Sequence, residues 1–281
     1  MAELAKQESW DLVIKPGSAT KEYWFDLWRY RELFFILSWR DISVRYKQTI
    51  IGVLWAVLRP LLTMLVFTIV FGKIAKLPSE RQAPYALMVY AAMLPWQFFA
   101  TAVQESSNSL VSNASLISKV YFPRLIIPTS SIITSFVDFI LSFAILLVLM
   151  AYYRFPPTWN MLLLPGFLLM AVLTAMGIGL YVTSLNVKFR DFRYVIPFII
   201  QIGLYISPVG FSSSIIPEQY RLWYSLNPMV GVIDGFRWAI LGGQSQLYWP
   251  GLLLSVGILL FFLWLGLSTF RKMERTFADM I

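Results

Sequence analysis

Long apolar runs alternate with short polar segments along most of the chain. The run from Gly52 to Gly72 has 21 residues and a single charge, Arg59. As a helix it would be ~31 Å long, close to the thickness of a bilayer's hydrocarbon core. Comparable runs recur, so the pattern predicts an all-α integral membrane protein with six transmembrane helices, at residues 52–72, 85–104, 126–151, 161–185, 194–211 and 249–270.

Residues 22–40 are apolar but carry five internal charges, which makes a membrane span costly. Aromatic residues among charges are typical of an amphipathic helix that lies in the membrane interface. We therefore expect two parts: an N-terminal segment, 1–50, with this interface helix, and one transmembrane domain, 51–281.

The segment between the last two predicted spans, residues 212–248, mixes apolar and polar positions. Pro217, Pro228 and the pair Gly242 and Gly243 interrupt it. Because proline and glycine break helices, we expect short helices here that dip into one leaflet.

The distribution of Lys and Arg predicts the orientation. With the N-terminus in the cytoplasm, the cytoplasmic segments hold 16 of these residues and the segments on the other side hold six. The positive-inside rule then places both termini in the cytoplasm. The net charge of +8 therefore reflects topology rather than nucleic-acid binding, since the cations lie in short loops beside apolar runs.

The composition narrows the chemistry. Hydrophobic residues make up 58% and charged residues only 14%, with a mean hydropathy of +0.66, which leaves too little polar sequence for a large soluble domain. The absence of Cys and His excludes metal sites and catalysis built on them. Since no phosphate-binding GxxxxGK[ST] loop occurs, ATP-driven work needs another polypeptide. We expect a non-enzymatic chain without catalytic, metal or cofactor-binding residues.

Two polar segments are candidates for contact with a partner. In residues 105–125 a short helix can start after Asn113 and end at Pro123, and it can dock into a partner or rest on lipid headgroups with equal plausibility. Residues 186–193, NVKFRDFR, fit a positive anchor at the membrane better than a second partner contact.

Charges and aromatic residues inside the spans are further candidates. Asp138 lies near the middle of the third predicted span, so it should face the bundle interior, paired or protonated. Arg59 is expected to reach the inner interface. The aromatic content of 17% fits interfacial belts, and also a channel whose rings stack on sugars.

The chain resembles the transmembrane permease subunits of bacterial polysaccharide ABC exporters, a group of type-2 ABC permeases that export O-antigen, teichoic acid or capsule. The resemblance runs from about Asp11 to Arg271. It is carried by four stretches in order: RDISVRYKQTIIGVLWAVLRPLLTMLVFTIVFG (40–72), ISKVYFPRLIIP (117–128), NVKFRDFRYVIPFIIQIGLYISPV (186–209) and LNPMVGVIDGFRWAILG (226–242).

This resemblance implies a homodimer that pairs with two copies of a separate ABC ATPase, in a bacterial inner membrane. ATP-Mg would bind only to that partner. The helix at 114–125 would be a coupling helix received by a cleft in the ATPase. The implied coupling residues are Ser115, Lys119, Tyr121, Arg124, Lys188, Arg190 and Asp191.

The resemblance also implies a path between the protomers. A lateral opening beside the first and fifth helices would admit a lipid-linked reducing end, whose pyrophosphate could meet Arg59 beside Pro60. Aromatic residues would line the channel, and short helices over 212–245 would form a periplasmic gate. The implied residues are Tyr90, Trp96, Phe98, Phe99 and Tyr205 for the channel, and Asn227, Pro228, Asp234 and Arg237 for the gate.

The implied function is ATP-driven export of undecaprenyl-linked polysaccharide, with O-antigen as the first choice of glycan. Three alternatives stay open at this point. They are a type-2 ABC exporter of drugs or small lipids, an ion-coupled secondary transporter that uses Asp138, and a scaffold for a glycosyltransferase complex.

Overall fold

The structure is a computed structural model that describes residues 20–47, 50–80, 83–243 and 247–277. In these ranges the chain forms helices and no strands, as the all-α prediction expected. The elements in order are α1 (Thr20–Arg29), α2 (Arg31–Lys47), α3 (Ile50–Phe67), the π-helix η1 (Thr68–Ile74), α4 (Tyr85–Ser112), α5 (Ala114–Lys119), α6 (Ile126–Tyr152), η2 (Trp159–Leu163), α7 (Leu164–Lys188), α8 (Phe192–Ile206), η3 (Ser213–Ile215), α9 (Glu218–Tyr224), α10 (Pro228–Ile240), α11 (Trp249–Met273) and η4 (Glu274–Thr276).

Five of the six predicted spans correspond to helices that are long and apolar enough to cross a membrane. Their ends differ from the predicted ones by a few residues, except that α4 continues eight residues past the predicted end at 104. They cover Val57–Ile74, Tyr85–Ser112, Ile126–Tyr152, Trp159–Lys188 and Trp249–Met273.

The fifth predicted span, 194–211, is the one that differs. The apolar helix α8 has only 15 residues, or ~22 Å, which is shorter than a bilayer's hydrocarbon core. It ends at Ile206 because Ser207 takes an extended conformation and Pro208 follows. The ring of a proline disfavours the α conformation of the residue that precedes it.

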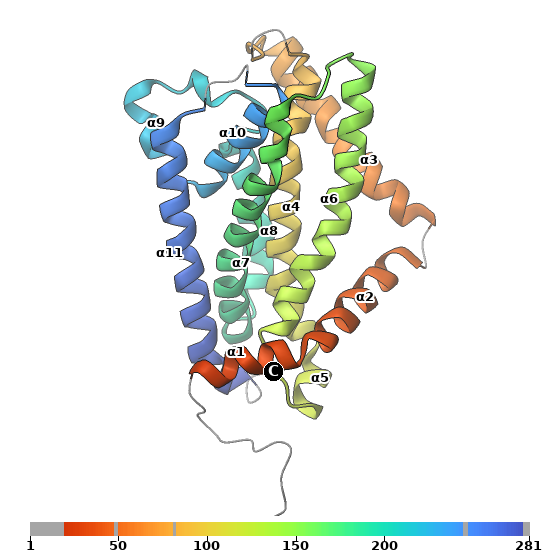
Figure 1. Cartoon of the computed structure of the whole chain (residues 1–281), viewed down its shortest axis with the longest axis vertical. Helices are drawn as coiled ribbons and strands as arrows, with labels where there is room; N and C mark the ends of the chain where they lie inside the picture. The colour runs from red at the N-terminus through yellow and green to blue at the C-terminus, as the bar shows by residue number, and fades with distance from the viewer. Residues whose placement is uncertain (1–19, 48–49, 81–82, 244–246, 278–281) are drawn as a thin grey trace, which may run out of the picture.

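The predicted interface helix, 22–40, is two helices. A turn at Tyr30 separates α1 from α2, and α2 continues beyond Arg40 to Lys47. In Figure 1, α1 lies across the lower end of the bundle and α2 rises obliquely from it. Large apolar side chains cover the outward face of both helices, a feature typical of contact with lipid: Trp24, Phe25, Trp28, Phe35, Ile36, Trp39 and Val44.

Helix α4 is the centre of the bundle. In its most apolar stretch 83% of the residues are buried, whereas only 11% are buried in Val57–Ile74, the stretch formed by α3 and η1. Helices α6 and α7 both pack along α4, and α11 packs along α7 (Figure 1). Because α4 is covered on all sides by protein, its apolar residues form no single stripe.

The crossing of α7 and α11 depends on two glycines. A Cβ atom added to Gly266 would lie 2.1 Å from the backbone oxygen of Gly177, and one added to Gly177 would lie 2.6 Å from the nitrogen of Leu263. Small residues allow helix backbones in membranes to approach this closely.

The short helices lie at the two ends of the bundle. Helices α1 and α5 and the C-terminal helical turn η4 lie at the lower end in Figure 1, and α9 and α10 lie towards the upper end. The Tyr23 hydroxyl donates to Oε1 of Glu274 at 3.1 Å and joins α1 to η4. The orientation of the chain in the membrane stays a prediction.

The region 212–248 contains the short helices that its sequence predicts. Asn227 caps α10 by accepting a hydrogen bond from the Met229 nitrogen at 3.0 Å, and Pro228 occupies the first turn. After α10, Gly242 and Gly243 have φ angles of 67° and 75°, a conformation that favours glycine.

Candidate functional site

Helices α3 and α8 flank α4 and leave a broad apolar face uncovered in the single chain. Only Ile196 of α8 is buried. Outward-facing residues on α8 recur at helical spacing: Phe198, Ile199, Ile202, Tyr205 and Ile206. An uncovered apolar face on α3 and α8 must contact lipid or the surface of another protein.

At the upper end of this face α3 and α8 converge. The rings of Phe67 and Tyr205 lie 6.2 Å apart, and a Cβ on Gly210 would lie 2.8 Å from the ring of Phe71. The hydroxyl of Tyr85 donates to the backbone oxygen of Gly210 at 2.5 Å. These contacts fix the turn that follows α8 against the start of α4.

Of the five aromatic residues predicted to line a channel, only Tyr205 is exposed, at 57%. Tyr90, Trp96, Phe98 and Phe99 are buried inside the protomer, and the Tyr90 hydroxyl donates to the backbone oxygen of Ser142 at 3.0 Å. In the single chain, Tyr205 is therefore the one of the five that is open to a second protomer. The other four belong to α4, the central helix, and pack the core, and their role in a channel stays a prediction.

Arg237 lies at the centre of a group of buried polar contacts near α10, at the upper end of the bundle. Its side chain is 0% exposed, and its guanidinium donates to the backbone oxygens of Phe211 at 2.7 Å, Val209 at 3.0 Å and Met88 at 3.3 Å. Oε1 of Glu80 lies 3.7 Å from Arg237 Nη1. Arg237 thereby holds the turn after α8 against α4.

Serine hydroxyls extend this network on both sides. Ser212 donates to Glu80 Oε1 at 2.6 Å, and Ser213 donates to Asp234 Oδ2 at 2.7 Å. Burial raises the pKa of Asp234 to about 6, although the bond from Ser213 and the charge of Arg237 act in the opposite direction. Two of the predicted gate residues, Asp234 and Arg237, thus lie in buried polar contacts at this end. A third, Asn227, donates from its amide to the Ser207 hydroxyl at 2.9 Å.

At the opposite end, α5 presents several of the predicted partner-contact residues. Ser115 and Lys119 are exposed, and Tyr121 just after the helix is 60% exposed. Ile117 on the other side of α5 is buried in the lower hydrophobic cluster. The helix is therefore anchored on one face and open on the other.

Arg124, also predicted to contact the partner, makes contacts within its own chain. Its guanidinium donates to the backbone oxygen of Glu274, and its backbone nitrogen donates to Oε1 of the same residue at 2.8 Å. Burial raises the pKa of the Glu274 carboxyl, against the effect of these bonds. Arg124 thus holds the end of α11 within its own chain, a role that its position in a basic loop did not indicate.

The turn between α7 and α8 presents Lys188, Arg190 and Asp191, which are all exposed. The ammonium of Lys188 lies 5.1 Å from the centre of the Phe189 ring. Asp191 precedes the first turn of α8, where a negative charge is favourable. These residues lie near the same end as α5, since α4 and α7 both end there (Figure 1).

Arg59 is exposed on α3, and Pro60 is buried beside it within the helix. The Thr63 hydroxyl donates to the backbone oxygen of Arg59 at 2.9 Å, one turn earlier in the same helix. The guanidinium therefore lies on the outer surface of α3, one of the two helices that bound the uncovered face.

Asp138 is paired, as its position predicted. Arg45 on α2 donates to Asp138 Oδ2 and to Glu105 Oε1, each at 2.7 Å, and the Tyr46 hydroxyl donates to Asp138 Oδ1. These partners could not be predicted from the sequence, because Arg45 and Asp138 are 93 positions apart. The cluster fastens α2 to α4 and α6.

Comparison with known proteins identifies the family. The sequence model of the ABC-2 type transporter family matches residues 32–241. The O-antigen export system permease protein RfbA of Klebsiella pneumoniae is 28% identical over 261 residues, which cover 89% of this chain and 95% of the relative. RfbA of Myxococcus xanthus is 28% identical over 258 residues, with 91% and 98% covered. The polysialic acid transport protein KpsM of Escherichia coli is 26% identical over 256 residues, with 84% and 91% covered. The chain therefore belongs to the ABC-2 type transporter family.

Proposed function

We propose that this chain is the transmembrane subunit of an ATP-driven exporter that moves undecaprenyl-linked polysaccharide, O-antigen in the first place, out of the cytoplasm across the inner membrane. One observation carries the proposal: the chain matches O-antigen export permeases almost from end to end. The capsule and polysialic acid transport proteins among its relatives support the wider class of substrate.

A second copy of the chain would cover the apolar face of α3 and α8. Paired in this way, two protomers would enclose a channel with Tyr205 at its wall. Arg59 would lie at its side, where a guanidinium can pair with the pyrophosphate of a lipid-linked glycan. The buried network of Arg237, Glu80 and Asp234 would hold the gate at the far end of this channel.

A separate ATPase would bind at the end that carries α5 and the α7–α8 turn. The open face of α5, with Ser115, Lys119 and Tyr121, offers a short helix that a cleft can receive. Lys188, Arg190 and Asp191 would make the second contact. ATP-Mg would bind to the partner, and this end would face the cytoplasm, in agreement with the excess of Lys and Arg in the segments assigned to it.

The alternatives are less well supported. An ion-coupled transporter that uses Asp138 is less well supported, because this carboxylate bonds Arg45 and Tyr46, which fasten α2 to α6. Export of drugs or small lipids shares this architecture, but the named relatives transport polysaccharide.

Genetic complementation tests the proposal. A strain that lacks the chain should lose its surface polysaccharide with unchanged drug tolerance, and the wild-type chain should restore it. Lys119→Glu should reduce export several-fold at normal chain levels, because it reverses a charge on the open face of α5. Lys73→Glu is the matched control, since Lys73 is exposed at the opposite end. Retention of surface polysaccharide in the deletion strain would refute the proposal.

A further inference from the structure

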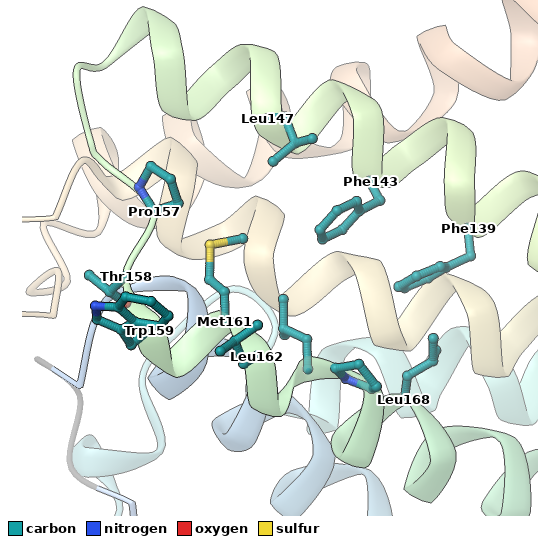
Figure 2. Close-up of a pocket in the computed structure, with 11 residues that line it drawn as sticks. Phe139, Phe143, Leu147, Pro157, Thr158, Trp159, Met161, Leu162 and Leu168 are labelled. Carbon is teal, nitrogen blue, oxygen red and sulfur yellow. The ribbon is translucent and has the colours of Figure 1, made fainter.

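An apolar groove with a volume of 720 Å³ lies between α6 and the segment formed by η2 and the start of α7. Figure 2 shows Phe139, Phe143 and Leu147 projecting from α6 towards Met161, Leu162 and Leu168 on the other wall. Both walls belong to candidate membrane spans. The groove exists because α6 and α7 each pack along α4 and contact one another much less.

The length of the groove matches a single leaflet. Phe139 lies at the middle of α6, and the wall continues through Leu147 towards the end of that helix. From Phe139 to Leu147 the helix rises ~12 Å, less than half of a ~30 Å hydrocarbon core. A linear chain parallel to the membrane normal therefore has the direction and depth to fill it.

The upper end of the groove changes from apolar to polar. Thr158 lines it there. Trp159 is 86% exposed beside it, and an indole of this kind is typical of headgroup depth. Arg154, four positions before Thr158, is exposed and is the only charged residue between Asp138 and Lys188.

We propose that this groove binds a membrane phospholipid of the leaflet at the α9–α10 end, with one acyl chain between α6 and α7 and the phosphate near Arg154. An empty apolar groove that faces lipid would forgo the dispersion contacts of its lining, and an acyl chain restores them. The guanidinium of Arg154 favours an anionic headgroup at its level over a neutral one. The site is separate from the α3–α8 face, and its test does not depend on transport.

Photo-cross-linking tests the site on the full-length chain in nanodiscs that contain phosphatidylglycerol with a diazirine in its acyl chain. Mapping the labelled peptides should place the label mainly on the groove walls, over 139–147 and 161–168. Leu168→Trp fills the groove and should lower this labelling several-fold. Leu169→Trp is the matched control, because Leu169 is exposed on the same helix and does not line the groove.

A second pair of variants guards against misfolding. Leu147→Trp should act like Leu168→Trp, whereas Val148→Trp, which changes an exposed neighbour, should label like the wild type. Arg154→Gln should reduce the preference for phosphatidylglycerol over phosphatidylcholine at the groove and leave labelling elsewhere unchanged.

Three results would overturn the proposal. The first is labelling spread evenly over all lipid-facing helices and insensitive to Leu168→Trp. The second is stronger groove labelling by a photoreactive polyprenyl phosphate than by the phospholipid, which would assign the groove to an isoprenoid. The third is cross-linking between two copies through cysteines introduced at the groove rim, which would make it a protein interface.

Discussion

Replacement of Arg237 by methionine tests the buried network that holds the turn after α8. Three backbone oxygens, those of Met88, Val209 and Phe211, would each lose a donor. A buried polar group left unsatisfied costs ~1–3 kcal/mol. The nearby carboxylate of Glu80, whose side chain is 10% exposed, would also lose its counter-charge.

These terms set the expected size of the effect. Breaking a buried ion pair costs ~3–5 kcal/mol, and the separation of 3.7 Å places this pair at the lower end. The turn can open and let water reach some of the carbonyls, so the terms do not add in full. We expect Arg237→Met to lower the free energy of unfolding by ~4 kcal/mol, a large part of a typical ~5–15 kcal/mol.

The measurement is thermal and denaturant unfolding of the chain in nanodiscs, with hydrogen exchange over residues 207–212. Arg193→Met is the control, since Arg193 is exposed and its guanidinium contacts only the Tyr194 ring among the described contacts, at 5.3 Å. Adding Glu80→Gln to Arg237→Met should recover part of the loss, because it removes the uncompensated buried charge. A change below ~1 kcal/mol for Arg237→Met, with unaltered exchange over 207–212, would refute this reasoning.

Three further predictions concern other parts of the bundle. The pKa of Asp234 is raised from 3.8 to about 6, so the folded chain holds this proton at higher pH than the unfolded chain. The contribution of Asp234 to stability therefore falls as the pH rises from about 4 to about 6. Asp234→Asn should flatten the dependence of the melting temperature on pH in this range, and an unchanged slope would contradict the assignment. Gly266→Ala should lower stability by ~1–3 kcal/mol because its Cβ would meet the Gly177 carbonyl. Gly257→Ala, with no atom within 4 Å of its Cβ, should not lower the melting temperature, because alanine is a better helix former than glycine. Arg45→Gln should lower the free energy of unfolding by only ~1 kcal/mol, since both carboxylate partners are partly exposed. It should also raise hydrogen exchange in α2, and wild-type exchange there would show that α2 is held by other contacts.

Three features of the fold could be predicted because each depends on the pattern of neighbouring residues. They are five of the spans, the interruption of helices in residues 212–248 and the pairing of Asp138. Length and hydropathy identify spans, proline and glycine mark breaks, and a lone intramembrane carboxylate needs a partner. The end of α8 at Ser207 also has a local cause, the proline that follows it.

The rest depends on packing that no local pattern reveals. The burial of the aromatic residues of α4 inside the protomer could not be predicted from the sequence, because a buried helix and a channel helix share the same composition. Arg124 looked like a surface cation, yet its partner, Glu274, is 150 positions away. Arg237 stood in a predicted gate, but its three carbonyl partners could be found only from the fold.

Transport by the purified complex tests the central claim most directly. The chain would be reconstituted in proteoliposomes with the ABC ATPase from its genomic neighbourhood, and entry of undecaprenyl-linked O-antigen would be followed with and without ATP. The account predicts accumulation that requires ATP, stops with vanadate and is reduced by Lys119→Glu but not by Lys73→Glu. A stable complex that hydrolyses ATP and moves no glycan would contradict it.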